Sequence, residues 1–235
     1  MPELSNHLRT PGTILFGVDE APPAPLNFGL PGSHEFRGFE VDLMYAVAHR
    51  LGLVPQFRSA PWSRILEDLG AHRLDVICGA ATVTPERARV VAFSRPYLEV
   101  TLVLVVRAGE PQTDPRQLMG RSVGVRAATE AERYLRAQVP SAQVHEFHLN
   151  TEQYAALASG TVDAVIDDAP IAGHFARITP GVIVVASLPG TQGHYAFVVA
   201  PDSARLRGAL DETLTELETD GTLAGLRREW LVGGR

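Results

Sequence analysis

The sequence predicts an α/β protein, and three observations support that prediction. Short apolar runs alternate with small-residue loops and amphipathic segments along the 235-residue chain. This alternation is typical of strands and helices that build mainly parallel sheets. The pattern has two centres, around Cys78 and around Ile166, which indicates two α/β lobes. A hydrophobic content of 45% is ordinary for a globular chain and argues against intrinsic disorder.

The first half of the chain supplies the elements around the first centre. In residues 39–51 apolar side chains recur at helical spacing, and Gly52 is a suitable C-terminal stop. The apolar positions of this helix are Val41, Met44, Tyr45, Ala48 and Leu51. A second helix is expected at 62–69, and strands are expected at 14–18, 55–58, 74–78, 89–93 and 100–106.

The second half repeats this arrangement around the second centre. Strands are expected at 122–125, 143–147, 162–166, 182–186 and 195–199. Helices are expected at 130–136, 151–158, 170–177, 204–219 and 223–230.

Composition excludes several classes of protein. The formal charge is −6 and no basic run occurs, so nucleic acid is not expected as a partner. The longest apolar run, residues 102–106, is far shorter than the roughly 20 residues of a membrane-spanning helix. All 21 basic residues are arginine, which rules out a Schiff-base lysine and a Walker-type phosphate loop. Cys78 is the single cysteine, so neither an intramolecular disulfide nor a cysteine-based zinc site is expected, and no cofactor or metal is predicted.

Small or charged residues follow four of the predicted strands. In open α/β sheets, ligands bind beyond the carboxyl ends of the strands. Those ends carry Asp19 and Glu20, then residues 79–87, then residues 126–129, and finally Asp167 and Asp168. Because these ends hold charges of opposite sign, they predict a small zwitterionic ligand.

The segment Thr84-Pro85-Glu86-Arg87 predicts a helix start. Thr84 is a suitable N-cap and Pro85 suits the first helical position. Arg87 would then lie near the positive end of the helix dipole, an arrangement that a bound anion would favour. A carboxylate fits, with a bidentate bond to Arg87 and further bonds from backbone N–H groups and the Thr82 hydroxyl. A surface arginine paired with Glu86 is the alternative, and the residues alone leave both open.

Asp168 and Trp62 also allow two interpretations each. Asp168 is either the N-cap of the helix that begins near Pro170 or the partner of a ligand ammonium group. Asp167 and Asp168 point to opposite faces of their strand, so at most one of them reaches a given pocket. Trp62 is either a core residue of its helix or a flat apolar wall beside a ligand.

Taken in order, these residues resemble the polar amino-acid-binding family of bacterial extracytoplasmic solute-binding proteins. The resemblance covers residues 13–231, and its early landmarks are Gly38-Phe39-Glu40-Val41-Asp42-Leu43, Trp62, Arg73-Leu74-Asp75-Val76-Ile77 and Thr82-Val83-Thr84-Pro85-Glu86-Arg87. The later landmarks are Phe93-Ser94-Arg95-Pro96-Tyr97, Val123-Gly124-Val125, Gly160-Thr161-Val162-Asp163-Ala164-Val165, Asp168 and Asp220-Gly221-Thr222.

The resemblance implies the two-lobed periplasmic binding protein type 2 fold. Two crossover strands, near residues 98–102 and 191–195, would join the lobes, and an amino acid would be clamped in the cleft between them. Lobe 1 would be discontinuous, formed by residues 1–98 and 195–235, with lobe 2 at 99–194. The lobes would close on the ligand, which would then be delivered to the membrane permease of an ABC importer.

The resemblance also assigns the ligand contacts. Arg87 matches the carboxylate-binding arginine and Asp168 the ammonium-binding aspartate. Thr82 and Thr129 match hydroxyl and backbone contacts to the carboxylate, and Trp62 matches the aromatic wall. The expected ligand-binding set is Asp19, Trp62, Ala80, Thr82, Arg87, Arg126, Thr129 and Asp168.

The chain departs from the family pattern where the ligand side chain would bind. Many members carry an aromatic residue shortly after the position of Asp19, but residues 19–26 contain none. Ala128 replaces a common glycine, and Arg126 stands where many relatives have glutamine or an apolar residue. Asp19 and Glu20 would favour a cationic side chain and Arg126 an anionic one, so the amino acid stays open.

The resemblance further implies a monomeric, non-enzymatic protein of the periplasm or another extracytoplasmic space. Residues 1–12 are polar and lack the apolar region of a signal peptide, which fits either a cytoplasmic chain or a mature secreted domain without its signal. The resemblance favours the second, so a signal is expected to have been removed. Two alternatives remain. Cyclohexadienyl dehydratases resemble these proteins but carry a glutamate shortly after the position of Asp168, where this chain has Ala169-Pro170-Ile171. A ligand-binding domain of a sensory receptor would show the same landmarks.

Overall fold

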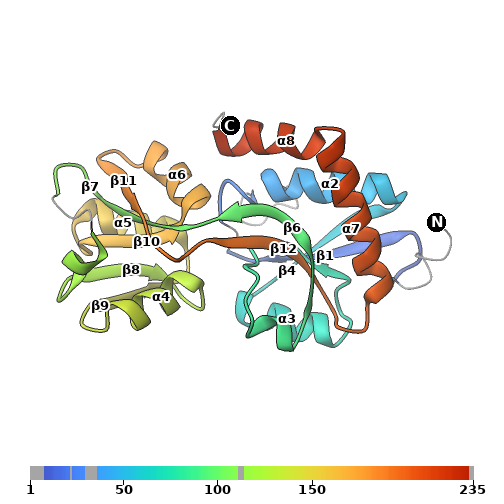
Figure 1. Cartoon of the computed structure of the whole chain (residues 1–235), viewed down its shortest axis with the longest axis horizontal. Helices are drawn as coiled ribbons and strands as arrows, with labels where there is room; N and C mark the ends of the chain where they lie inside the picture. Colours follow the sequence, from blue (N-terminus) through green and yellow to red (C-terminus); the bar gives the residue numbers. More distant parts are fainter. Residues whose placement is uncertain (1–7, 22, 30–35, 111–113, 233–235) are drawn as a thin grey trace. The chain divides into compact units, whose positions relative to one another are not determined.

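The computed structural model describes residues 8–21, 23–29, 36–110 and 114–232. The chain divides into two compact units (Figure 1). Unit 1 consists of Met1–Glu99 together with His194–Arg235, and unit 2 consists of Val100–Gly193. The chain therefore passes between the units twice, once after Glu99 and once after Gly193.

Unit 1 is built on a mixed five-stranded sheet in the order β4–β1–β5–β12–β6. Its strands are β1 (Thr13–Asp19), β4 (Val54–Ala60), β5 (Val76–Ile77), β6 (Ala92–Val100) and β12 (Gly193–Val199). Strand β1 runs parallel to β4 and β5, whereas β12 runs antiparallel to β5. A two-stranded sheet, β2 (Phe28–Gly29) with β3 (Phe36–Arg37), completes the strands described in this unit.

Helices lie on both sides of the unit 1 sheet in Figure 1, with α2 and α8 above the strands and α3 below them. The helices are α2 (Phe39–Leu51), α3 (Trp62–Gly70), α7 (Ala204–Thr219) and α8 (Thr222–Arg227), which continues into a π-helical turn, Arg228–Val232. Ile65 and Leu69 of α3 are buried in the core cluster that contains Ile77 and Val198. A separate set of rings, Phe16, Phe39, Tyr97 and Phe197, packs with centroids 5.1–6.2 Å apart.

Unit 2 holds the second five-stranded sheet, in the order β11–β7–β10–β8–β9. Its strands are β7 (Leu102–Arg107), β8 (Ser122–Arg126), β9 (Gln143–Phe147), β10 (Ala164–Asp168) and β11 (Val182–Ser187). Strand β8 runs parallel to β9 and β10, and β7 runs antiparallel to β10 and β11. Both sheets are therefore mixed, because β12 in unit 1 and β7 in unit 2 run antiparallel to the neighbouring parallel strands.

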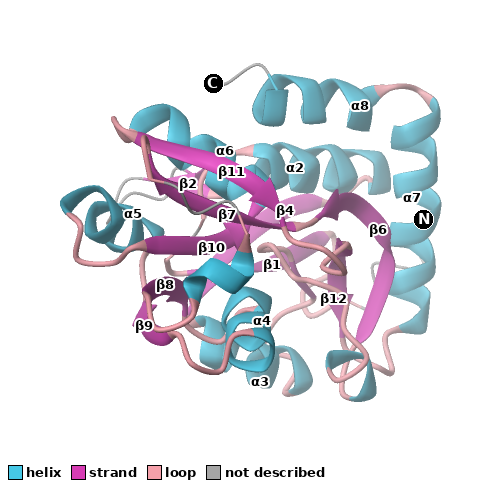
Figure 2. Ribbon diagram, turned by 60° about the vertical axis from the view of Figure 1, so that its left-hand side comes forward, coloured by secondary structure: helices cyan, strands magenta, loops and turns pink. Residues whose placement is uncertain are grey.

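The helices of unit 2 are α4 (Glu130–Gln138), α5 (Asn150–Ser159) and α6 (Ala169–Ile178), with a 3₁₀ turn at Pro115–Leu118 (Figure 2). Alternate residues of β7 and β10, such as Leu104 and Ile166, pack in the cluster that contains Leu135 of α4. The intervening residues Val105 and Val165 are also fully buried. Both faces of these strands are thus covered, which explains their almost uninterrupted apolar sequence.

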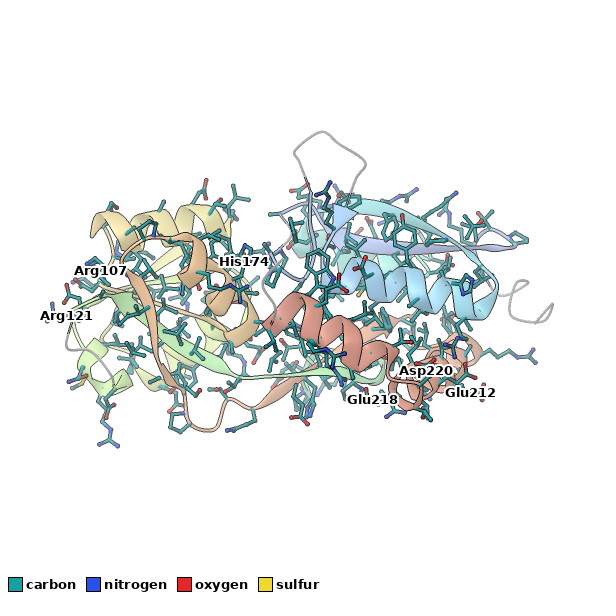
Figure 3. The ribbon with its side chains drawn as sticks, turned by 90° about the horizontal axis from the view of Figure 1, so that it is seen from above. Arg107, Arg121, His174, Glu212, Glu218 and Asp220 are labelled. Atoms are coloured by element: carbon teal, nitrogen blue, oxygen red, sulfur yellow. The ribbon has the colours of Figure 1, made fainter. Side chains whose placement is uncertain are left out.

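Long polar side chains tie the outer parts of unit 2 together. Arg107, labelled in Figure 3, donates hydrogen bonds from Nη1 to the carbonyl oxygens of Leu157 (2.9 Å) and Val162 (2.7 Å). These bonds satisfy the carbonyl of Leu157 in the last turn of α5, where no further helical turn follows, and that of Val162 beyond the helix. Among the described residues, no helix is long and apolar enough to cross a membrane.

Most of the expected elements are confirmed, and three details are wrong. The segment after Thr84 forms only the 3₁₀ turn Arg87–Arg89, so no α-helix begins among the described residues there, and β6 starts at Ala92 instead of residue 89. Strand β5 is limited to Val76–Ile77.

Candidate functional site

In unit 1 the ends of the parallel strands bring predicted site residues together. The register pairs Phe16 with Val76 and Gly17 with Ile77, so β1 and β5 end side by side. A Cβ atom placed on Gly79 would lie 3.8 Å from the backbone nitrogen of Asp19. Asp19 itself is buried, and its Oδ1 accepts a hydrogen bond from the N–H of Ala21 (3.1 Å). The strand ends at Asp19 and Gly79 therefore lie side by side in unit 1.

The segment that follows β5 turns sharply and is pinned to β12. Ala80 has a positive φ of 53°, a left-handed conformation that is uncommon for a residue with a side chain. Thr82 forms an isolated bridge with Tyr195, and the N–H of Val83 donates to the carbonyl of His194 (2.9 Å). These contacts fix the course of the backbone through Ala80 and Thr82, both of which belong to the predicted ligand-binding set.

Arg87 folds back on the same segment. Its Nη1 donates to the carbonyl oxygen of Thr82 (2.9 Å), and the hydroxyl of Thr84 accepts from the Arg87 N–H (3.2 Å). The Thr84 hydroxyl thus accepts one N–H of the turn, but the N-cap residue is Glu86, and the short 3₁₀ turn carries no macrodipole of α-helical size. The predicted N-cap at Thr84 and the predicted helix dipole beside Arg87 are therefore wrong, whereas the hydrogen bond from Arg87 to Thr82 is direct.

A buried carboxyl group lies behind this segment. Glu40 of α2 is fully buried, and its Oε1 accepts hydrogen bonds from the Tyr97 hydroxyl (2.6 Å) and the Ala80 N–H (2.8 Å). Burial raises the pKa of Glu40 to about 7, although both hydrogen bonds act in the opposite direction. Burial likewise raises the pKa of the Cys78 thiol, so the single cysteine is an unreactive core residue.

In unit 2 the predicted residues lie at the ends of β8 and β10. These strands run parallel, with Val165 opposite Gly124, which brings their carboxyl ends to the same edge. Arg126 ends β8 and is half-buried. The hydroxyl of Thr129 donates to the Arg126 carbonyl (2.7 Å) while Thr129 serves as the N-cap of α4. The Thr129 hydroxyl therefore has a local structural role.

Asp168 ends β10 and is the N-cap residue of α6. Its side chain makes no capping hydrogen bond with any described residue of that helix. Asp168 therefore takes the N-cap position that one interpretation gave it, but its carboxylate makes no side-chain capping bond within the described residues. The half-buried carboxylate stands at the end of β10, and its role as the partner of a ligand ammonium group stays a prediction.

The neighbouring Asp167 points into the core, on the face opposite to Asp168. Its Oδ2 accepts from Nδ2 of Asn150 (2.9 Å) and the hydroxyl of Tyr154 (3.2 Å), and its Oδ1 accepts from the Asp168 N–H (2.9 Å). Burial raises the pKa of Asp167 to about 7; the charge of Asp168 adds to this effect, and Arg126 counteracts it. The acceptor bond holds the backbone of Asp168 in place.

Sequence reasoning missed the roles of Glu40 and Asp167. The signal for Glu40 was an acidic residue four positions before Met44, on the buried face of an otherwise apolar helical pattern. The sequence placed Asp167 on the strand face opposite to Asp168 but gave no sign of its hydrogen bonds with Asn150 and Tyr154. Trp62 is the first residue of α3, and its side chain lies outside the described residues.

Two α/β units, each with charged residues at the ends of parallel strands, define the class of two-lobed ligand-binding proteins. The chain is 27% identical to the L-cystine-binding protein TcyJ of Escherichia coli over 97% of this chain and 85% of the relative. Among solved structures, a mutant of ArgBP from T. maritima superposes with a TM-score of 0.87 at 27% identity, covering 97% of this chain and 98% of the other. The ancestral amino acid-binding protein AncCDT-1, described as a precursor of cyclohexadienyl dehydratase, gives a TM-score of 0.87 at 27% identity over 94% and 96% of the two chains.

A family model extends this similarity to nearly the whole chain. It matches residues 14–233. The chain belongs to the bacterial extracellular solute-binding proteins, family 3.

Proposed function

We propose that this protein is an extracytoplasmic receptor that binds a free L-amino acid and delivers it to the permease of an ABC importer. The observation that supports this most directly is the presence of opposite charges in the two units, Arg87 on the turn after β5 in unit 1 and Asp168 at the end of β10 in unit 2. The relatives named for L-cystine and arginine binding support the same ligand class. We further propose that the free protein is a monomer.

The recognition that we propose divides the ligand's charges between the two units. Arg87 binds the carboxylate, assisted by the hydroxyl of Thr82 and backbone N–H groups near Ala80. Asp168 binds the ammonium group. Because each unit supplies one charge, a bound amino acid stabilises the conformation in which both units contact it, as population shift requires.

The charged residues near the ligand's side chain decide its identity in this proposal. Asp19 is buried at the end of β1, and Arg126 is half-buried at the end of β8. A cationic ligand side chain would pair with Asp19, and an anionic one with Arg126. The ligand panel must therefore contain both kinds.

Calorimetric titration of refolded, ligand-stripped protein against the twenty L-amino acids and L-cystine tests the proposal. We expect tight binding of one chemical group of amino acids, which Arg87→Ala abolishes. Arg89→Ala is the matched control, because Arg89 lies on the same 3₁₀ turn but is exposed. No binding by any member of the panel contradicts the proposal.

The similarity to AncCDT-1 makes an enzymatic control worthwhile. A dehydratase needs a general acid, and the first residues of α6 after Asp168 are Ala169, Pro170 and Ile171. We therefore propose a binding protein without enzymatic activity. Incubation with prephenate and with arogenate is expected to give no product, and turnover of either compound would replace the receptor proposal.

A further inference from the structure

The side chain of Glu40 connects three elements of unit 1 through one oxygen atom. Oε1 accepts from Tyr97 of β6 (2.6 Å) and from the N–H of Ala80 after β5 (2.8 Å), while the backbone of Glu40 belongs to α2. The second oxygen, Oε2, is buried and has no hydrogen-bond partner among the described residues.

Packing alone does not account for this carboxyl group. Its surroundings are largely apolar and aromatic: the ring of Phe39 lies 6.1 Å from that of Tyr97, which lies 5.1 Å from that of Phe197. An apolar side chain in these surroundings would avoid the cost of burying a carboxyl group with one unpaired oxygen. The interactions that require the carboxyl group are therefore the two hydrogen bonds that Oε1 accepts.

The bond to Ala80 acts on a strained point of the backbone. Ala80 holds a φ of 53°, and residues other than glycine keep such a conformation only where their surroundings enforce it. From there the chain continues through Thr82, whose carbonyl oxygen accepts from Arg87 (2.9 Å). The other side of the segment is held by the bond from Val83 to His194 (2.9 Å).

We propose that Glu40 is a positioning residue for ligand binding: its Oε1 orients the peptide that joins Gly79 to Ala80, and through it the segment that presents Thr82 and Arg87. The inference rests on the proposed function, because the segment is assigned there to the ligand carboxylate. Glu40 itself does not touch the ligand in this proposal.

Glu40→Gln tests the inference, with Asp75→Asn as the matched control. Glutamine keeps the size of the side chain but replaces a charge-assisted acceptor with a weaker neutral one. Asp75 is also a buried acid of unit 1 that accepts two backbone N–H groups, from Arg9 (2.9 Å) and Leu15 (2.8 Å). The Asp75 carboxylate binds the backbone at Arg9 and Leu15 and makes no hydrogen bond to the described residues 80–87. The control therefore weakens similar hydrogen bonds at a different place in unit 1.

The experiment is calorimetric titration of the full chain and both variants with L-arginine, L-glutamine and L-cystine separately. It is performed at about pH 8, where the Glu40 carboxylate is ionised. For an amino acid that the unmodified chain binds, we expect Glu40→Gln to raise Kd at least about tenfold and Asp75→Asn less than about threefold. Equal effects of the two substitutions overturn the inference, because they show general destabilisation, and so does an unchanged Kd in Glu40→Gln.

A second measurement covers the case in which Glu40→Gln does not fold. In the unmodified chain, NMR follows the Ala80 amide and the Glu40 side-chain carboxyl carbon while the same amino acids are added. Both signals are expected to shift in proportion to ligand saturation. If neither signal shifts while the ligand binds, the inference is overturned.

If the unmodified chain binds none of the three amino acids but another member of the full panel, that amino acid replaces them as the probe. If it binds none at all, the proposed function fails, and the inference fails with it. Binding by the unmodified chain combined with two NMR signals that do not shift, or with equal effects of the two substitutions, removes the inference alone.

Discussion

Units 1 and 2 each place a buried carboxyl group behind a predicted ligand contact. Glu40 accepts the N–H of Ala80, and Asp167 accepts the N–H of Asp168. Each also accepts a tyrosine hydroxyl, from Tyr97 and Tyr154 respectively. Burial raises the pKa of both groups to about 7. The parallel strands of the two sheets, β4–β1–β5 and β9–β8–β10, follow the same order, and both sheets carry a similar arrangement.

The difference between the two groups lies in how they are supported. Asp167 sits next to the residue that it holds, and both of its oxygens accept hydrogen bonds. Glu40 lies on a helix 40 residues before Ala80 and has one buried oxygen without a partner among the described residues. The support in unit 2 is thus local, whereas that in unit 1 depends on the docking of α2 against the sheet. Unit 1 should be the more sensitive to changes around its carboxyl group.

Removing either residue that we propose to bind a ligand charge should weaken binding more than any other change. Arg87→Ala in unit 1 and Asp168→Ala in unit 2 should each weaken amino-acid binding by about 3–5 kcal/mol, because each leaves a desolvated charge of the ligand without its partner. This corresponds to a rise in Kd of more than about 100-fold, measured by calorimetry. Arg89→Ala and Glu152→Gln, at exposed positions of the respective units, serve as controls. Unchanged affinity in either alanine variant contradicts the assigned division of charges.

A glycine substitution compares the tolerance of the two units to added volume. Gly38 precedes α2 with a φ of 128°, and a Cβ atom there would lie 2.4 Å from the carbonyl oxygen of Leu26. In unit 2, a Cβ atom on Gly124 would meet side chains instead, 3.1 Å from Phe147 and 3.2 Å from Val165. We expect Gly38→Ala to lower the free energy of unfolding by about 3 kcal/mol and Gly124→Ala by about 1 kcal/mol.

Urea denaturation measures this glycine pair. Gly208→Ala is the control, since Gly208 lies inside α7 and an added Cβ would meet no described atom within 4 Å apart from its chain neighbours and its own helix backbone, and alanine favours a helix. This variant should be slightly more stable than the unmodified chain. A larger loss for Gly124→Ala than for Gly38→Ala would show that the entry to α2 adapts.

The pH dependence of stability compares the buried acids themselves. Since the folded pKa of each is about 7 and the ordinary value lies near 4.5 for Glu40 and 3.8 for Asp167, the folded state binds more protons between these limits. Both groups therefore favour folding at low pH, and their contribution is lost as pH rises to about 7. Stability relative to Glu40→Gln or Asp167→Asn should fall over this range by about 1–3 kcal/mol.

Denaturation at pH values from about 4 to 8 measures that difference. Other groups have the opposite pH dependence. Hydrogen bonds from Thr222 and Arg50, for example, lower the pKa of Asp220 to about 2. The contributions of such groups cancel when a variant is compared with the unmodified chain. Asp167 has the wider pH window and should show the larger change. A difference that rises with pH contradicts the raised pKa values.

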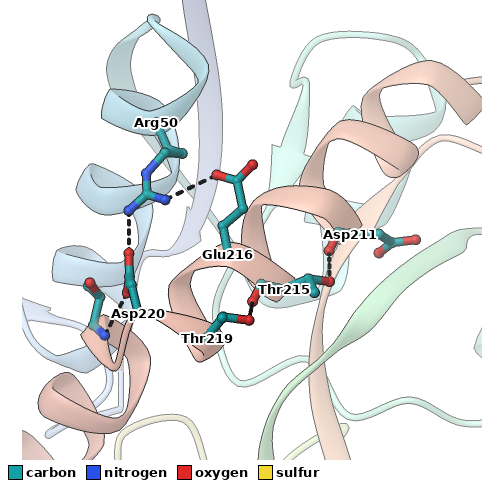
Figure 4. A network of polar contacts seen from close by, with 7 residues as sticks. Arg50, Asp211, Thr215, Glu216, Thr219 and Asp220 are labelled. Carbon is teal, nitrogen blue, oxygen red and sulfur yellow. Dashed lines mark hydrogen bonds and ion pairs between the residues drawn. The ribbon is translucent and has the colours of Figure 1, made fainter.

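The smallest effect is expected at the surface of unit 1. Arg50 of α2 forms ion pairs with Glu216 (3.0 Å) and Asp220 (2.6 Å) at the end of α7 (Figure 4). All three side chains are at least about one-third exposed, so solvent and salt screen the pairs. Arg50→Ala should lower the free energy of unfolding by less than about 1 kcal/mol, and high salt should reduce the difference further. A loss above about 2 kcal/mol would mean that these ion pairs hold α7 against α2.

Elements whose signals are local could be predicted from the amino-acid sequence. The helical periodicity of residues 39–51 and the apolar runs at β7 and β10 correctly predicted a helix and two strands, because spacing along one element decides which face it buries. The strand-end positions of Asp19, Arg126 and Asp168 followed from the same pattern. These residues could be placed because each is adjacent in sequence to the strand that positions it.

The surroundings of the chemistry-bearing groups depend on tertiary packing and could not be predicted. A capping threonine and a proline predicted an α-helix at Arg87, but the chain returns to the sheet at Ala92 after a three-residue turn, which leaves no room for one. The bond between Glu40 and Ala80 joins groups that are 40 positions apart, and no local pattern encodes such a pairing. Burial and hydrogen bonding at long range depend on how α2 docks on the sheet, and so does the raised pKa of Glu40.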